Sequence, residues 1–269
     1  MPPRQGPSVT LRAAAFTGGL LLLLLAACGG GGGGGGSTLK LPTAVPTGQE
    51  SSLLSLDRFH YVASLTMKGA GADGAPVQIA VSTEGDFQSP DRHAFTYSTQ
   101  FQGVTFAESA VVIGDKIWIR RGEGPWQEAS VADEQAQRLF STAFSPIRPN
   151  FLGGPEWRNV RETVRRLPST PEFVNDVRAV HYSVGPQGEE YFRSFLAQED
   201  IFQQVQDPHW ELWLAEDGDW PVRLLASGMV NTDLQILRDL GLGTPVSWEL
   251  RIDVSRPNDP MLVVTAPTS

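Results

Sequence analysis

Short segments in which apolar and polar residues alternate constrain this chain most. The clearest covers residues 248–254, where Trp, Leu, Ile and Val alternate with Glu, Arg and Asp. A period of two places alternate side chains on opposite faces of a strand, so a segment of this kind buries one face. Similar segments begin near His60, Val77 and His93, and Gly114-Asp115 between two further segments is a hairpin signal. The pattern predicts half-buried, mainly antiparallel strands.

Helical spacing of apolar residues occurs in fewer places. Residues 133–144 and 189–205 are predicted to be helices, and residues 231–240 a third, shorter one. Residues 156–167 suit either a helix or an edge strand. Residues 261–265 are expected to form the last strand. The count is about nine to eleven strands and about three helices.

The first 27 residues have the features of a secretory signal. Arg4 and Arg12 precede an apolar stretch from Ala13 to Ala27. This stretch is shorter than the roughly 20 apolar residues that span a bilayer core. Residues 1–27 are therefore predicted to be a secretory signal peptide and not a transmembrane helix.

The apolar stretch ends in Leu25, Ala26, Ala27 and Cys28, and Cys28 is the only cysteine in the chain. These residues resemble the lipobox of bacterial lipoproteins. The resemblance implies a diacylglyceryl group on the Cys28 sulfur, with acyl chains such as palmitate, and cleavage just before this residue. The alternative is an ordinary signal peptide with an incidental cysteine. Two acyl chains give lasting anchorage, so we expect the protein on the outer, extracytoplasmic face of the membrane.

Eight consecutive glycines, Gly29–Gly36, follow the cysteine. Glycine has the largest backbone freedom and offers no side chain to bury, so residues 28–50 are predicted to be a lipidated cysteine with a flexible tether. Residues 51–269 are then expected to form a single domain.

Composition excludes several classes of function. The formal net charge is -9, and no cluster of Lys and Arg stands out, which argues against nucleic acid as a partner. One cysteine and four histidines exclude a disulfide scaffold and leave too few ligands for a structural zinc site. We expect neither a metal nor a cofactor.

The sequence offers no catalytic signature, because the HExxH, GxSxG and P-loop patterns are absent. Gly69, Gly71 and Gly74 match the GxGxxG string, but a predicted strand follows them where a dinucleotide site needs a helix, so they indicate a hairpin loop. The four histidines are isolated in or beside predicted strands. We predict that the protein is not an enzyme; a hydrolase with dispersed catalytic residues is the alternative.

Four segments together resemble a known family. They are residues 87–92, residues 112–119 with Trp126, residues 210–224 and residues 261–267. Their turn and hairpin patterns look like the lipoprotein carrier fold of LolA, LolB and the mycobacterial lipoproteins LppX and LprG. The resemblance implies an α+β, mainly antiparallel β fold: a strongly curved half-barrel sheet with about three helices plugging its open side. Another β-barrel, such as a lipocalin-like one, is the alternative.

The resemblance also implies a function: binding of a lipid, an acyl chain or a lipidated molecule in an apolar cavity, and its transport across the envelope. The alternative is a non-enzymatic sensor or interaction module on the same fold that binds another envelope protein. The candidate cavity-lining residues are Phe95, Tyr97, Ile117, Ile119, Leu139, Phe140, Phe144, Leu212, Trp248, Leu250 and Ile252.

Overall fold

The structure, a computed structural model, describes residues 53–130, 133–142, 152, 157–196 and 204–268. The first six strands are β1 (Arg58–Ala70), β2 (Pro76–Gln88), β3 (Arg92–Phe101), β4 (Val104–Ile113), β5 (Lys116–Arg121) and β6 (Gln127–Ala129). The later strands are β7 (Arg165–Arg166), β8 (Glu172–Val174), β9 (Val177–Ser183), β10 (Val205–Ala215), β11 (Pro221–Val230) and β12 (Gly243–Ser255). The helical elements are the 3-10 turn η1 (Leu53–Ser55) and the helices α2 (Glu134–Thr142), α3 (Trp157–Thr163), α4 (Pro186–Leu196) and α6 (Gln235–Asp239).

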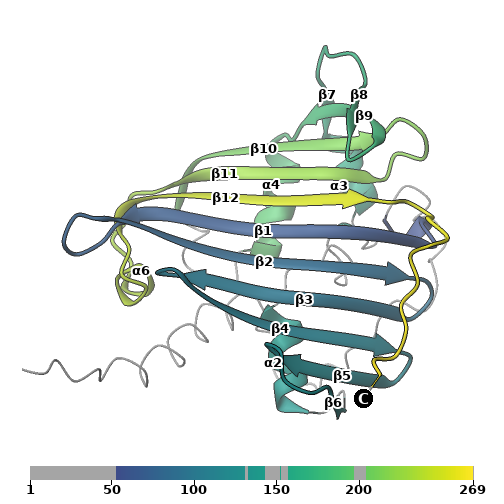
Figure 1. The fold of residues 1–269 in the computed structure, drawn as a ribbon. Coiled ribbons are helices and arrows are strands. Elements are labelled where there is room, and N and C mark those ends of the chain that lie inside the picture. The colour runs from purple at the N-terminus through teal and green to yellow at the C-terminus, as the bar shows by residue number, and fades with distance from the viewer. Residues whose placement is uncertain (1–52, 131–132, 143–151, 153–156, 197–203, 269) are drawn as a thin grey trace, which may run out of the picture.

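In the described residues, all twelve strands belong to one antiparallel sheet, in the order β6-β5-β4-β3-β2-β1-β12-β11-β10-β9-β7, with β8 paired to β9. Because β1 pairs with both β2 and β12, the first and last strands meet in the middle of the sheet. Figure 1 shows a curved sheet with α2, α3 and α4 on one side of it. The edge strands β6 and β7 do not pair with each other. The sheet is therefore open, and the predicted α+β half-barrel is confirmed.

Strand pairing explains which side chains are buried. Tyr61, Ala63 and Leu65 of β1 are at most 5% exposed, and the residues between them are partly or fully exposed. Leu65 lies opposite Val81 of β2 and Leu250 of β12, so these residues share one face. We call the face covered by the helices the inner face and the opposite one the outer face.

Aromatic contacts join the helices to the inner face. Phe140 of α2 packs edge-on against Phe95 of β3, with ring centroids 5.3 Å apart. Phe192 of α4 stacks on Trp210 of β10 at the same separation, and Trp210 lies 6.2 Å from Trp248 of β12. Large aromatic side chains bury about 150–250 Å² each, so these contacts contribute strongly to holding α2 and α4 against the sheet.

The expected last strand is the clearest difference from the sequence prediction. Residues 261–265 form an extended tail that pairs with no strand. Leu262 and Val264 are buried, while Met261 is 81% and Val263 55% exposed. An extended segment alternates its side chains whether or not a neighbouring strand supplies hydrogen bonds, so a period of two alone does not predict pairing.

The predicted helices also differ in their ends. The helix expected at residues 189–205 is α4, which begins three residues earlier; residues 197–203 lie outside the described part, and Val205 already belongs to β10. The ambiguous residues 156–167 contain both α3 and the two-residue strand β7. The helix expected at 231–240 is only α6, and its N-cap residue Leu234 makes no side-chain capping bond. Within the described residues, no helix has the length and apolarity to cross a membrane.

Candidate functional site

Strand register places the predicted cavity residues of the sheet on the inner face. Phe95 of β3 lies opposite Ala110 of β4, which in turn lies opposite Ile119 of β5. On the other side of the sheet, Leu212 lies opposite Leu224, which lies opposite Ile252. The candidates that are at most 5% exposed are Phe95, Tyr97, Ile117, Ile119, Leu139, Leu212, Trp248, Leu250 and Ile252. Phe140 is partly buried, and Phe144 lies outside the described residues, as do Cys28 and the lipobox.

The inner face also holds buried polar groups, which the sequence pattern did not predict. The Tyr61 hydroxyl is 2.8 Å from Nε2 of His93, and the Thr99 hydroxyl donates to the Tyr97 hydroxyl at 2.9 Å. Burial lowers the pKa of His93 to about 3, against the charge of Asp86, which raises it. The imidazole is therefore neutral at physiological pH, and this part of the inner face carries no charge.

At one end of the half-barrel the apolar inner face reaches solvent. Val104 lies opposite Phe101, and Phe106 lies opposite Thr99, so both β4 residues belong to the inner face. Val104 is 52% and Phe106 is 54% exposed. Among the described strands, β5 pairs with β4 only from Glu108 onward, so no neighbouring strand flanks these two residues on that side. We call this end, formed by Val104 and Phe106, the apolar rim.

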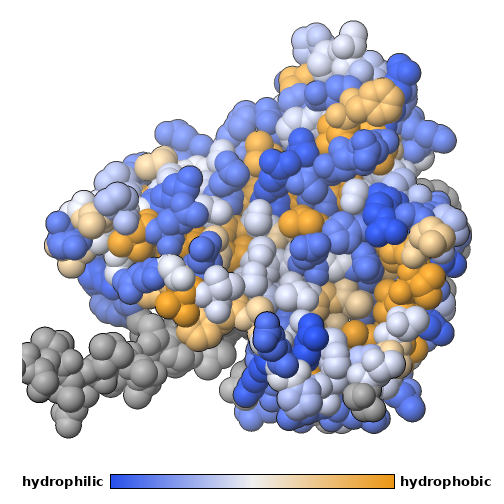
Figure 2. Space-filling view, viewed as in Figure 1, coloured by the Kyte–Doolittle hydropathy of each residue, from blue (hydrophilic) through white to orange (hydrophobic). Residues whose placement is uncertain are grey.

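The opposite end carries the C-terminal tail. Arg58 donates to the carbonyl oxygens of Pro260 and Leu262, at 3.1 and 3.2 Å, and Arg92 donates to that of Val264 at 3.0 Å. The tail therefore runs past the ends of β1 to β4 (Figure 1). Figure 2 shows hydrophobic residues gathering along this edge, whereas the outer face of the sheet is more hydrophilic. Both ends of the half-barrel expose apolar side chains, Met261 and Val263 at the tail and Val104 and Phe106 at the rim, but at the tail end arginines bind the segment to the sheet.

Among the described residues, no group of three His, Cys, Asp or Glu side chains could hold a metal ion. The Asp217-Gly218-Asp219 turn, with Gly218 and Asp219 at positive φ, connects β10 to β11. The Gly69–Gly74 segment ends β1 and enters the loop to β2, which is the hairpin expected from the sequence.

No protein-family model matches this sequence, and no curated protein matches it. Among solved structures, a LolA superfamily protein from Nitrosomonas europaea is 13% identical, with 81% of this chain and 94% of that chain covered and a TM-score of 0.27. A protein of a family of unknown function from Desulfovibrio piger is 12% identical, with 78% and 88% covered and a TM-score of 0.26. A putative outer membrane lipoprotein-sorting protein domain from Vibrio parahaemolyticus is 14% identical, with 75% and 86% covered and a TM-score of 0.20.

These matches include proteins of the kind that the sequence resemblance named. At identities of 12–14% this likeness concerns the fold alone. The chain is similar to LolA-like proteins, with an open half-barrel whose inner face is apolar and covered by helices.

Proposed function

We propose that the protein binds a lipid or acyl chain against the inner face of the half-barrel and carries it across the envelope. The observation that supports this most is the apolar rim, because Val104 and Phe106 extend the buried apolar surface out to solvent. An acyl chain entering there would pass from water onto uncharged side chains. Burial of about 16 carbons at roughly 0.8 kcal/mol per methylene supplies on the order of 10 kcal/mol before the costs of ordering.

In this proposal α2 and α4 are the movable cover. Helices of 9 and 11 residues are too short to be stable on their own, so the sheet contacts of Phe140 and Phe192 hold them. A ligand chain that replaces these contacts offers the sheet a similar apolar surface. When the ligand replaces a helix on the sheet, the apolar area that is buried then changes little. This suits a carrier that must also release its cargo.

The proposal includes an anchor at the N-terminus. Residues 1–27 act as the signal peptide, Cys28 receives the acyl chains, and residues 29–50 link the anchor to the domain. Mass spectrometry of the membrane-extracted protein tests this part separately. An N-terminal peptide that begins at acylated Cys28 is expected, and an unmodified Cys28 would contradict it.

Lipid uptake is tested on residues 28–269 carrying Cys28→Ser, which lacks the anchor but keeps the rest of the mature chain. Native mass spectrometry after gentle purification should show bound species that dissociate as phospholipid or fatty acid. A protein that is free of lipid, and stays so after incubation with phospholipid vesicles, would refute the carrier function.

The exposed phenylalanines provide a matched pair of variants. Phe106→Ser removes the larger side chain of the apolar rim and should reduce uptake of a fluorescent fatty acid at least about fivefold, as expected for about 1 kcal/mol of lost apolar contact. Phe173 of β8 is also an exposed phenylalanine, with 77% of its surface accessible. Phe173→Ser should leave uptake unchanged. Equal effects of both substitutions would show that the rim is not the entrance.

A further inference from the structure

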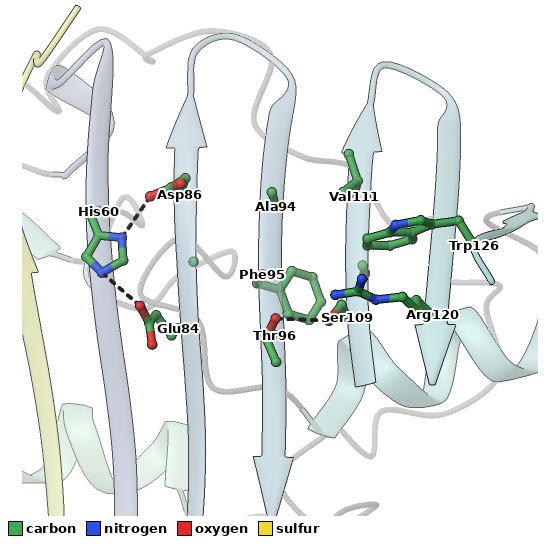
Figure 3. A pocket seen from close by; sticks show the side chains of 12 residues that line it. His60, Glu84, Asp86, Ala94, Phe95, Thr96, Ser109, Val111, Arg120 and Trp126 are labelled. Carbon is green, nitrogen blue, oxygen red and sulfur yellow. Dashed lines mark hydrogen bonds and ion pairs between the residues drawn. The ribbon is translucent and has the colours of Figure 1, made fainter. Parts of the chain in front are cut away.

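The outer face of the sheet has a depression that the proposed lipid site does not use. Its volume is about 460 Å³, and it lies over β1 to β5, on the side away from the helices (Figure 3). The outer-face side chains of the floor are small and leave room above the strands: Ala94, Thr96 and Ser109. Gly85, Phe95 and Ala110, whose side-chain positions belong to the inner face, also line the depression.

One wall of the depression is acidic. His60 of β1 lies between two carboxylates of β2, with Nδ1 2.7 Å from Asp86 and Nε2 3.6 Å from Glu84. The Glu84 side chain is 67% and the Asp86 side chain 39% exposed. No arginine or lysine of the described residues pairs with either carboxylate. The two carboxylates make this wall acidic.

The opposite wall is basic and aromatic. The Arg120 guanidinium of β5 lies over the Trp126 ring, 4.7 Å from its centroid. Nε of Arg120 is buried and has no hydrogen-bond acceptor in the described part of the chain. No carboxylate there lies within ion-pair distance of it either. A buried donor without an acceptor is unfavourable, and the guanidinium has no anionic partner within the described part of the chain.

The two walls stand in one row of the sheet. Glu84 lies opposite Thr96, Thr96 opposite Ser109, and Ser109 opposite Arg120. The Thr96 and Ser109 hydroxyls are hydrogen-bonded to each other at 3.0 Å on the floor between the walls. Three strand spacings separate the acidic and basic residues, about 14 Å between their backbones. The depression therefore presents opposite charges on its two walls, with two hydroxyl groups between them.

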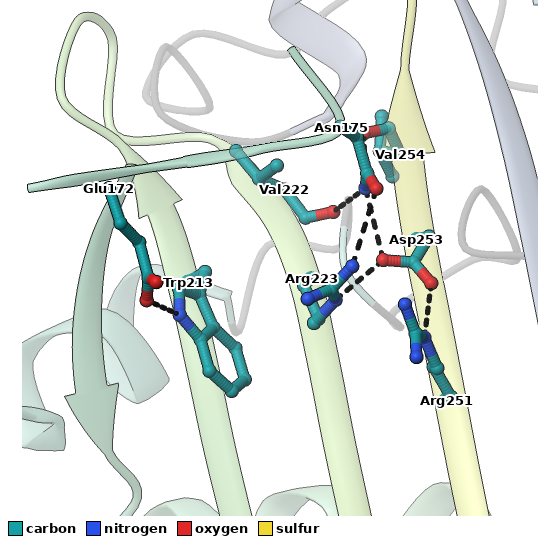
Figure 4. Close-up of polar contacts among 8 residues, drawn as sticks. All are labelled: Glu172, Asn175, Trp213, Val222, Arg223, Arg251, Asp253 and Val254. Carbon is teal, nitrogen blue, oxygen red and sulfur yellow. Dashed lines mark hydrogen bonds and ion pairs between the residues drawn. The ribbon is translucent and has the colours of Figure 1, made fainter. Parts of the chain in front are cut away.

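A second arginine on the outer face shows what a fully paired site looks like. Arg223 donates to Asp253 at 2.6 Å and to Asn175 at 3.3 Å, and it also lies 5.7 Å from the Trp213 ring (Figure 4). Beside Trp213, the Arg223 guanidinium thus donates to acceptors within the chain. Beside Trp126, Nε of Arg120 has no acceptor in the described residues. This contrast argues that the depression at Arg120 is a binding site rather than a structural contact.

We propose that the depression binds an extended peptide segment that carries both a carboxylate and a basic group. The carboxylate pairs with Arg120, and the basic group pairs with Glu84 and Asp86. Charge complementarity selects this ligand, because both ends of the site are charged and of opposite sign. Glu84 and Arg120 lie on strands that are not neighbours, so an extended segment with separated charges matches the site. The site is independent of the inner face.

The test uses residues 28–269 with Cys28→Ser and the peptide N-acetyl-Lys-Gly-Gly, which has one ammonium and one free C-terminal carboxylate. Two control peptides each lack one charge: the C-terminal amide, and the version with norleucine in place of lysine. Isothermal titration or NMR titration should give saturable binding of the first peptide and at least about fivefold weaker binding of each control.

Variants assign the charges to the two walls. Arg120→Gln should remove the preference for the free carboxylate over the amide, and Glu84→Gln should reduce the preference for lysine over norleucine. Lys116→Gln and Glu249→Gln change the same charges at exposed positions of the outer face outside the depression and should leave all affinities unchanged.

Three results would overturn the proposal. One is the absence of saturable binding of any peptide up to about 10 mM, near the lower limit of measurable affinity. Another is an Arg120→Gln variant, folded by circular dichroism, that still distinguishes acid from amide. The third is binding to phosphatidylethanolamine vesicles that depends on Arg120, with no peptide binding, which would assign the depression to a lipid headgroup.

Discussion

The outer face places two Arg–Trp pairs in different settings, one at each half of the sheet. Arg223 of β11 lies directly opposite Asp253 of β12, so the strand register itself supplies its carboxylate. Arg120 of β5 lies directly opposite Ser109, which gives only a hydroxyl. The difference shows that the cross-strand neighbour decides whether an arginine of this sheet finds a carboxylate within the chain.

The β8–β9 hairpin strengthens the first pair further. Its turn residue Asn175 has a positive φ of 52° and donates to Asp253 at 3.0 Å and to the Val254 carbonyl at 3.1 Å. Burial alone would raise the pKa of Asp253, but the hydrogen bonds from Arg251, Asn175 and Arg223 outweigh it and lower this pKa below its ordinary value. The strands around Arg120 contribute no comparable loop in the described residues.

Lowering the pH should destabilise the two halves of the sheet to different extents. The largest loss of stability should come from His93. This histidine lies on the inner face of β3, in the half that holds the depression, and its pKa is lowered from 6.5 to about 3. Between these values the unfolded chain binds a proton that the folded protein does not. Stability should therefore fall as pH drops below 6.5, by up to about 1.4 kcal/mol per pH unit.

The measurement is the free energy of unfolding in urea at pH 7, 5.5 and 4, for the wild type and His93→Gln. The variant removes the titrating group and should show a shallower slope between these values. Identical slopes in both proteins would show that His93 does not remain neutral in the fold.

Substitution at Asp253 should give the next largest effect. Asp253→Ala leaves Arg223, Arg251 and Asn175 without their shared acceptor and should cost about 2–3 kcal/mol at pH 7. Because the folded pKa is lowered, this contribution is complete above about 3.8 and lost as pH falls below that value. Urea unfolding at pH 7 and pH 3 checks both statements. Glu249→Ala, at an exposed position of the same strand, is the control and should cost less than about 0.5 kcal/mol.

The two arginines can then be compared by the same substitution. Arg223→Met should cost about 1–2 kcal/mol, since Asp253 and Asn175 lose a partner. Arg120→Met should cost less than about 0.5 kcal/mol or even stabilise the fold, because it removes a buried donor that has no acceptor. Equal losses, measured by urea unfolding at one pH, would show that both arginines are structural.

The smallest expected effect concerns the tryptophan beside Arg120. Trp126→Leu should cost about 0.5 kcal/mol, the size of a cation–π contact at a partly exposed site. Trp213→Leu should cost clearly more, because it also removes the bond to Glu172 at 2.7 Å and the stacking on His181 at 4.0 Å. Thermal unfolding of the two variants gives the ranking, and a larger loss at Trp126 would reverse it.

The alternation of apolar and polar residues by itself determined that this chain forms half-buried, mainly antiparallel strands, whereas the half-barrel was implied by the family resemblance. It also determined which residues of a strand share a face, because a strand has a fixed period of two: Phe95, Tyr97 and Ile119 lie on the inner face together. The same period could not reveal that residues 261–265 lack a strand partner, since pairing depends on what lies beside an extended segment.

Only the tertiary structure forms the depression on the outer face. Glu84, Thr96, Ser109 and Arg120 come from four different strands, and only the pairing of β2 to β5 brings them into one row. The sequence marked His60 as an isolated histidine, because its partner Asp86 is 26 residues away along the chain. Local patterns report the conformation of a segment, whereas charge complementarity between strands arises only when the register of the folded sheet is set.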